Sequence, residues 1–445
     1  MKKDTKQMVL FKDFFHKSVE IDFNGGDISS DTGLLFISQY ERKLGIIQRF
    51  CDELEDRRHP SYIRHPHPEL MRQRVFQIIA GYSDGNDSNA LRKDPVFKMV
   101  CGQLPKNGKD LASQPTFSRL ENAPSRTDLY RMGQAIVDGY IASKQSPPDK
   151  IILDIDDTDD ITHGNQQLSL FNAFHGDYCY MPIHVYDGDT GDLIMSMLRP
   201  GKRPSGKEIA MILKHIIVCI RKAWPNVRII VRGDGNYGVS DVLDFCESHN
   251  LQYVFGFTGY APVLRKAKSW MREAKIHYNK LHRISKSYGE FPYRAKKWKQ
   301  ARRVIVKAEH SKKGANTRFV VTNLKRHCPK NLYKNIYCQR GKMELWIKEH
   351  KVHLQSDRTS CSSFQANQFR LFLHSLAYRI LHSYRVNALK ATGFAKSQFD
   401  TIRLHLIKIG ARILELATRV KVHLPTSFAY QEDIRILYAE CCGPG

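Results

Sequence analysis

Apolar residues in the first part of the chain recur at helical spacing. Between Leu70 and Tyr82 they stand three and four residues apart, which predicts an amphipathic helix. A second helix is predicted over about residues 125–144, and it ends before the turn at Pro147-Pro148. Residues 1–148 are therefore expected to form a mainly helical N-terminal region.

The period changes after this proline pair. Short β-branched runs at 151–156, 180–186 and 193–198 predict three strands, and residues 187–192, with two glycines, predict a hairpin turn between the last two. A helix over 208–224, a strand over 228–231, a helix over 240–249 and a strand over 252–257 follow. Three strands followed by helix, strand, helix and strand is the order of an RNase-H-like α/β layer, so 149–257 is expected to be the first part of such a core.

A lysine- and arginine-rich segment, residues 258–325, interrupts this layer. It contains predicted strands near 291–294, 303–308 and 318–322. Helical periodicity then resumes, with one helix around 371–381 and another from Ile402 to Leu416. The expected fold class is α/β: an RNase-H-like catalytic domain (149–257 and 326–390) interrupted by a basic β-rich insertion (258–325), after the helical N-terminal region and before a C-terminal helical region (391–445).

Charge is distributed very unevenly along the chain. The 445 residues include 70 Lys and Arg and 45 Asp and Glu, a net charge of +25. Residues 261–350 hold 25 Lys and Arg but only 5 Asp and Glu, a net +20, whereas residues 151–200 hold nine Asp and one basic residue. An acidic pocket beside a basic surface suits an enzyme that holds divalent metal while it grips a phosphate backbone.

Signals for a membrane or for secretion are lacking in the sequence. No stretch approaches the roughly 18 uninterrupted apolar residues of a membrane span, and the apolar run after Met1-Lys2-Lys3-Asp4 is too short for a signal-peptide core. The ten cysteines form no C-x-x-C pair, which fits reduced thiols. We therefore expect a cytoplasmic protein with no membrane partner.

Two groups of carboxylates stand at predicted strand ends. Asp154 and Asp156 are two apart and share one face, while Asp157 points to the other. Asp234 ends the next strand, between Gly233 and Gly235. Clustered carboxylates need a cation or solvent to offset their repulsion; Asp also favours turns and helix caps, and either interpretation fits each position taken alone.

A further carboxylate, Glu344, is one of the five acidic residues in the strongly basic stretch 261–350. Tyr337, Arg340, Glu344 and Lys351 are 3, 4 and 7 residues apart, which places all four along one face of a helix. Such a stripe is ordinarily a solvated face. Glu349, five residues from Glu344, would point about 140° away at the α-helical period, so it is expected to face solvent.

This set resembles a known signature. Tyr-x2-Arg-x3-Glu-x6-Lys matches, at Tyr337 to Lys351, the YREK signature of bacterial insertion-sequence DDE transposases. Further segments in the same order are similar to the insertion-sequence 1380 family: 153–158 with 162–164, 178–180 with Pro182, 199–201, 232–234, 321–324, 357–358 and 366–368.

The resemblance implies a DNA transposase that binds the terminal inverted repeats of its element, cleaves the ends and joins them to target DNA by two-metal phosphoryl transfer. Asp156, Asp234 and Glu344 would be the catalytic and metal-binding triad, with Asp154 the alternative to Asp156. The cofactor would be two Mg²⁺ ions, with Mn²⁺ able to substitute.

The same resemblance implies how DNA is held. Tyr337, Arg340 and Lys351 would bind DNA phosphates. Trp298, interleaved with lysines, would stack on a flipped base or else pack an edge strand. The partners implied are double-stranded DNA and further copies of the chain, as a homodimer or larger multimer in the bacterial nucleoid. The alternatives are an RNase-H-like nuclease without strand transfer and a domesticated DNA-binding protein.

Overall fold

The computed structural model describes residues 8–11 and 19–442, so the N-terminal residues 1–7 considered for a signal peptide lie outside it. The chain forms two compact units. Unit 1 takes the described residues within 1–47, 56–119 and 383–445, and unit 2 takes 48–55 and 120–382. The finer division into five segments stays a prediction. In the described residues, no helix is both long and apolar enough to cross a membrane.

Helices dominate the first 148 residues, as predicted. They are α1 (Leu34–Leu44), α2 (Ile46–Cys51), α3 (His67–Ala80), α4 (Asp87–Leu91), α5 (Pro95–Val100), α6 (Gln114–Glu121) and α7 (Arg126–Ala142), after the short strands β1 (Met8–Phe11), β2 (Val19–Ile21) and β3 (Ile28–Ser29). The helix predicted over 125–144 is α7, whose start is fixed by a capping box between Ser125 and Asp128.

The predicted C-terminal helix from Ile402 to Leu416 is wrong in its second half. Helix α15 (Phe399–Ile402) continues as a π-helical turn, Arg403–Ile407, and the chain then enters β15 (Ala411–Glu415). β15 pairs with β16 (Val420–His423) and with β3. Ala411 and Ile413 are buried and Arg412 is exposed, so the apolar spacing in this stretch is the alternation of a strand. Helix α16 (Gln431–Cys442) follows.

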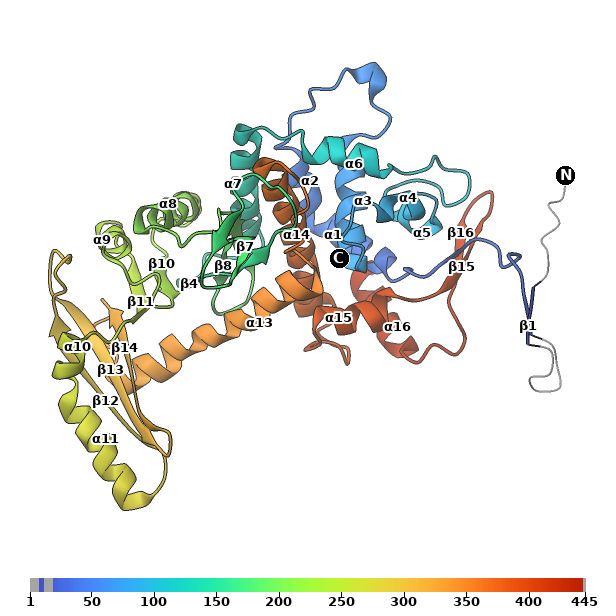
Figure 1. Ribbon diagram of the computed structural model, residues 1–445. Helices are drawn as coiled ribbons and strands as arrows, with labels where there is room; N and C mark the ends of the chain where they lie inside the picture. The colour runs from blue at the N-terminus through green and yellow to red at the C-terminus, as the bar shows by residue number, and fades with distance from the viewer. Residues whose placement is uncertain (1–7, 12–18, 443–445) are drawn as a thin grey trace. The chain divides into compact units, whose positions relative to one another are not determined.

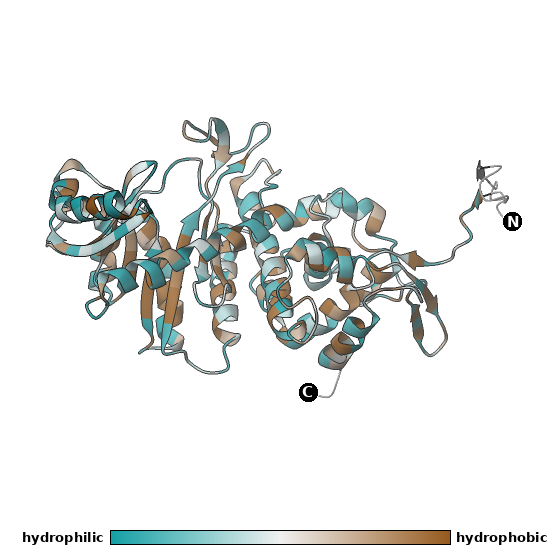
Figure 2. Cartoon of the chain, turned by 90° about the horizontal axis from the view of Figure 1, so that it is seen from below, coloured by the Kyte–Doolittle hydropathy of each residue, from teal (hydrophilic) through white to brown (hydrophobic). Residues whose placement is uncertain are grey.

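Unit 2 is built on one eight-stranded mixed sheet (Figure 1). Its central strands β4 (Lys150–Asp157), β10 (Arg228–Gly233) and β11 (Gln252–Phe257) are parallel neighbours. The hairpin of β8 (Ile183–Asp187) and β9 (Leu193–Met197) lies antiparallel beside β4. Buried hydrophobic residues fill the central strands β4, β10 and β11, as expected for strands covered on both faces, and hydrophobic strands run through the sheet in Figure 2.

The hairpin, helix and strand order predicted for 149–257 is confirmed. Helix α8 (Gly206–Ala223) connects β9 to β10, and α9 (Ser240–Ser248) connects β10 to β11. One predicted strand, 180–186, is divided: β7 (Asp177–Tyr180) belongs to a second, three-stranded sheet with β5 (Asp160–Ile161) and β6 (Leu170–Asn172), and only the rest is β8. The three-stranded sheet follows directly after the aspartates of β4.

The basic segment continues the large sheet. The three predicted strands are present and longer than expected, as β12 (Ser285–Tyr293), β13 (Arg302–Ser311) and β14 (Gly314–Thr322), and β14 pairs antiparallel with β11. Two helices that the sequence reading missed precede them, α10 (Ala261–Lys266) and α11 (Lys268–Leu281), and α11 runs beside β12 and β13 (Figure 1).

After β14 a long helical segment crosses one face of the sheet. It runs from α12 (Pro329–Asn331) through a π-helical turn (Leu332–Tyr337), a 3₁₀ turn (Cys338–Gly341) and α13 (Lys342–Lys348) to a second π-helical turn (Glu349–His353). Leu332 packs into a buried cluster with Ile152 and Ile230 from β4 and β10. Helix α14 (Phe364–Ser383), almost wholly buried, completes unit 2 up to residue 382. The segment 329–353 is called the crossing helix below.

Candidate active site

Two aspartates meet at the carboxyl ends of neighbouring parallel strands. Asp156 is the penultimate residue of β4, and Asp234 directly follows β10, whose register places Gly233 beside Ile155. Both carboxylates line one cavity of about 540 Å³. Ligands and substrates of α/β sheets bind at this edge, beyond the carboxyl ends of the strands.

Asp154 is committed to a different contact. Its carboxylate is fully buried and accepts hydrogen bonds from both Nε (2.5 Å) and Nη2 (2.6 Å) of Arg232. The Arg232 side chain is also buried. The remaining Arg232 nitrogen donates to the carbonyl oxygen of Ile336 in the crossing helix (2.6 Å). With its charge already balanced, Asp154 is less available than Asp156 to hold a cation.

The loop that carries Asp234 is held tightly. Asn236 donates its backbone N–H to Asp234 Oδ1 (2.7 Å) and its side-chain amide to Oδ2 (3.2 Å). The loop lies against Gly256 of β11, where an added Cβ would stand only 2.7 Å from the nitrogen of Gly235 and 2.8 Å from Oη of Tyr337. Glycine at 256 therefore lets the Asp234 loop and Tyr337 approach the sheet together.

The crossing helix brings three of its four signature residues to these loops. Arg340 Nη1 lies 2.8 Å from Asp156 Oδ2. Lys351 Nζ donates to Thr158 Oγ1 (3.3 Å) and also contacts the carboxylate (3.2 Å) and carbonyl oxygens of Asp159. Burial raises the pKa of Tyr337, with Asp234 adding to the rise and Arg340 opposing it.

The surroundings of Glu344 and Glu349 differ from those expected from the sequence. Glu344 is exposed and does not line the carboxylate cavity. The expectation that Glu349 faces solvent is wrong, because its side chain is only 4% exposed. Helix α13 keeps the α-helical period up to Lys348, so the reason is not the period: the side of the helix on which Glu349 lies is covered by protein, with Tyr186 of β8 close to its carboxylate.

Four carboxylates crowd the cavity, those of Asp156, Asp157, Asp159 and Asp234. Burial raises the pKa of Asp156 to about 7; Arg340 opposes this rise, and Asp234 and Asp157 add to it. Such a concentration of oxygen donors with unfavourable mutual repulsion suits a hard divalent cation. Within the described chain, however, no three His, Cys, Asp or Glu side chains stand close enough together to form a complete metal site.

Other residues of the cavity were missed in the sequence reading. Phe174, in the turn between β6 and β7, lines it with a side chain that is 91% exposed, and Arg203 lines it as a cation. The remaining lining residues are Thr158, Asn172, His175, Met181 and Asn236. The sequence signal that could have found Phe174 is an aromatic residue beside a histidine and a glycine, shortly after the aspartate cluster.

Trp298 is 5% exposed and lies between β12 and β13, two of the strands β12–β14 that the basic segment adds to the large sheet, called the sheet extension below. Its ring packs against those of Phe257 (5.2 Å between centroids) and Tyr293 (5.9 Å), and the Arg302 guanidinium lies 5.1 Å from its centre. Of the two roles expected from the sequence, base stacking and packing in the protein, these contacts fit packing.

The match to a family of known proteins covers almost the whole chain. A family model described as "Transposase DDE domain group 1" matches residues 11–441. The chain belongs to this DDE transposase family. The aspartates at the ends of β4 and β10 thus lie in the DDE domain of a transposase, a class that generally uses divalent metal ions.

The transposase is similar to a solved structure titled "Cryo-EM structure of piggyBac transposase synaptic complex with hairpin DNA (SNHP)". The two share 10% sequence identity over 85% of this chain and 80% of that one, with a TM-score of 0.44. No curated protein matches the sequence.

Proposed function

We propose that this DDE transposase binds the terminal inverted repeats of an insertion sequence of the 1380 family, cleaves the element ends and joins them to target DNA. The observation that carries the proposal is the pairing of Arg340 with Asp156. It brings a cation of the YREK set to the carboxylates of Asp156 and Asp234, at the edge of the sheet where ligands of α/β proteins bind.

We infer that the catalytic core is RNase-H-like. The support is the order of the first five strands of the large sheet, β9-β8-β4-β10-β11, with an antiparallel hairpin on one side of β4 and parallel strands on the other. The basic segment then adds β14, β13 and β12 beyond β11.

Asp156, Asp234 and Glu344 would hold two Mg²⁺ ions, for which Mn²⁺ could substitute. When bound, such a pair of ions activates the attacking oxygen and stabilises the leaving oxygen of a phosphoryl transfer. Glu344 lies on α13, one turn beyond Arg340, and its charge acts on the Arg340 guanidinium that contacts Asp156.

The cations of the crossing helix have a second task when DNA is present. Arg340 would exchange the Asp156 carboxylate for a phosphate near the cut, which frees that carboxylate. Tyr337 would donate to the same phosphate, and Lys351, now holding Thr158 and Asp159, would bind another. Trp298, with the packing described above, would support the sheet extension.

The helical N-terminal region would supply much of the recognition of the inverted repeats, and the protein would act in the bacterial cytoplasm on nucleoid DNA. A homodimer or larger multimer would bring two ends together. These assignments follow from the family resemblance of the sequence.

Strand joining separates this function from that of a nuclease. Purified protein would be given pre-cut ends that carry the sequences bordering its gene, a plasmid target and Mg²⁺. Covalent joining that is lost in Asp234→Ala is the expected result. Cleavage of uncut ends with no joining of pre-cut ends would identify a nuclease, and binding without either reaction would identify a domesticated DNA-binding protein.

A further inference from the structure

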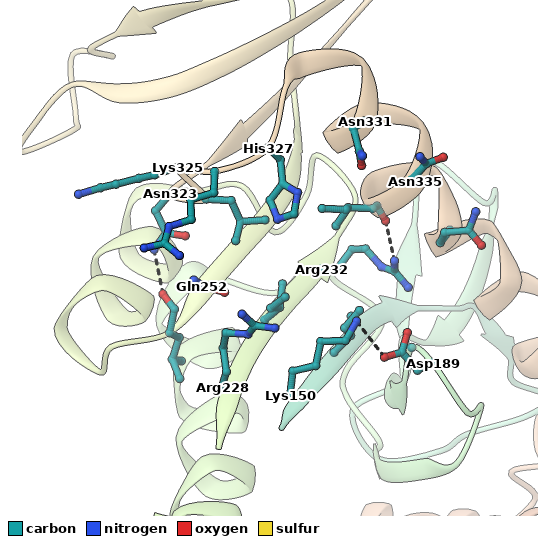
Figure 3. A pocket seen from close by; sticks show the side chains of 18 of the residues that line it. Lys150, Asp189, Arg228, Arg232, Gln252, Asn323, Lys325, His327, Asn331 and Asn335 are labelled. Carbon is teal, nitrogen blue, oxygen red and sulfur yellow. Dashed lines mark hydrogen bonds and ion pairs between the residues drawn. The ribbon is translucent and has the colours of Figure 1, made fainter. Parts of the chain in front are cut away.

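A large basic cavity lies on the side of the crossing helix away from the carboxylates. Its volume is about 990 Å³, and it forms where β4, β10 and β11 begin, at Lys150, Arg228 and Gln252 (Figure 3). The loop after β14 and one side of the crossing helix close it. The carboxylate cavity lies at the other ends of β4 and β10.

Its cations outnumber its anions, and the anions already have partners. Asp189 pairs with Lys150 (3.3 Å), and Glu247 pairs with Arg302 (2.7 Å). The cations that remain are Arg228, Lys325, Arg326 and Lys342, all exposed. None of these four side chains forms a hydrogen bond or an ion pair with another described residue. The cavity therefore offers four unneutralised charges to a ligand.

Amide side chains complete the lining. Asn331, Asn335 and Gln339 project from the crossing helix at four-residue spacing, and Lys342 continues the same side of the helix. Tyr337 and Arg340 project from its other side toward the carboxylates. One side of the crossing helix thus carries Tyr337 and Arg340 toward the carboxylates, and the other carries Lys342 and the amide side chains toward this cavity.

The loop that supplies Lys325 and Arg326 is fixed in place. Asn323 donates to the carbonyl oxygen of Leu251 (2.9 Å) and accepts from the backbone N–H of Tyr253 (2.9 Å). Arg303 donates to the carbonyl oxygens of Leu324 and His327. The backbone that carries Lys325 and Arg326 is thus ordered before any ligand arrives, which lowers the entropic cost of binding.

We propose that this cavity, bordered by Arg228, Lys325, Arg326 and Lys342, binds the phosphate backbone of a DNA segment distinct from the one held at the carboxylates. The assignment of DNA as the ligand of this cavity rests on the proposed function. Sites for small molecules are mostly apolar with a few polar groups, whereas this lining is cationic and amide-rich, as in protein contacts to DNA phosphates. Four spread cations match several phosphates of one strand better than a single small anion.

Salt-dependent binding tests the proposal. The full-length protein without Mg²⁺ would be titrated with a fluorescent DNA duplex of mixed sequence over a range of salt concentrations. A triple variant, Arg228→Gln with Lys325→Gln and Arg326→Gln, should bind at least about tenfold more weakly. The slope of log K against log salt should fall by about 2 to 3, because each phosphate contact contributes about 0.9.

The matched control removes three positive charges from another surface. Lys207, Lys214 and Lys222 are exposed on α8 and line neither cavity. Their triple glutamine variant should keep both the affinity and the slope. Equal losses in the two triple variants would show that only total charge matters, and unchanged binding in both would also overturn the proposal.

Lysine acetylation of the wild type provides a measurement that needs no variant. Bound DNA should protect Lys325 and Lys342 and leave Lys207 reactive. Equal reactivity of Lys325 with and without DNA would contradict the site. Because neither experiment uses cleavage, the site can fail while the transposase activity stands, and the activity can fail while the site stands.

Discussion

Arg232 and Asp154 form a two-pronged ion pair that joins β10 to β4, with nitrogen–oxygen distances of 2.5 and 2.6 Å and both side chains buried. The pair lies between the carboxylate cavity and the basic cavity, and Arg232 also holds the crossing helix through Ile336. Gly188 makes room for it, because an added Cβ there would come within 2.8 Å of both partners.

Breaking this pair from one side should destabilise the protein strongly. Arg232→Met leaves a buried carboxylate without its partner, a change that typically costs about 3–5 kcal/mol. Arg232→Met combined with Asp154→Leu should recover most of that loss. Urea unfolding of the three proteins measures the difference, and a double variant no more stable than Arg232→Met would contradict the explanation.

Trp298→Ala should lower stability because a buried ring is removed from between Phe257 and Tyr293. Truncation of a core tryptophan typically costs about 3–5 kcal/mol. Thermal unfolding is the measurement, with the exposed neighbour Lys297→Ala as control. Unchanged stability together with a loss of end processing would instead favour base stacking by Trp298.

Much of the core could be predicted because its signals are local. Short runs of strand-forming residues marked β4, β8, β9, β10 and β11, and apolar residues at helical spacing marked α3. The aspartates at the ends of β4 and β10 meet because parallel neighbours end at one edge of the sheet, so their proximity also follows from the sequence.

The rest depends on contacts distant in sequence. Glu349 is buried because the crossing helix packs on more than one side, with Tyr186 of β8 close to the Glu349 carboxylate. The strand over Ala411–Glu415 forms because β16 and β3 pair with it. The basic cavity is lined by the first residues of three strands, by a loop and by one side of the crossing helix. No local sequence pattern shows that these segments lie together.

Phe174→Ala should weaken binding of a DNA end without lowering stability. The ring is 91% exposed beside the carboxylates, and stacking of one base on an aromatic contributes about 1–3 kcal/mol. End affinity should therefore fall by roughly tenfold or more, and Phe174→Trp should restore it. Tyr438→Ala, which removes an exposed aromatic of α16 outside this cavity, serves as control. Equal affinity of Phe174→Ala and wild type would exclude the contact.

Acid should destabilise the protein through a buried histidine of the sheet. Burial lowers the pKa of His184 from 6.5 to about 3, with Lys351 adding to the shift, and its Nδ1 lies 2.8 Å from Ser196 Oγ. Because the unfolded chain takes up the proton first, stability is retained above about pH 6.5. Below that it falls by about 1.4 kcal/mol per pH unit for this residue.

The comparison for this effect is His184→Gln, which should reduce the slope of the free energy of unfolding against pH by about 1.4 kcal/mol per unit between pH 6.5 and 4.5. The exposed His163→Gln should leave that dependence as it is in the wild type. The explanation fails if both variants follow the wild-type curve.

Cleavage of element ends tests the assignment of the catalytic residues most directly. Duplex DNA carrying the sequences that border the gene would be incubated with Mg²⁺ and wild type, Asp156→Ala, Asp234→Ala or Glu344→Ala, with Asp154→Ala and its stability measured in parallel. The account predicts cleavage by the wild type and a loss of at least about a thousandfold in each of the three triad variants, since each removes part of the phosphoryl-transfer site. Cleavage by the three variants at the wild-type rate would contradict it.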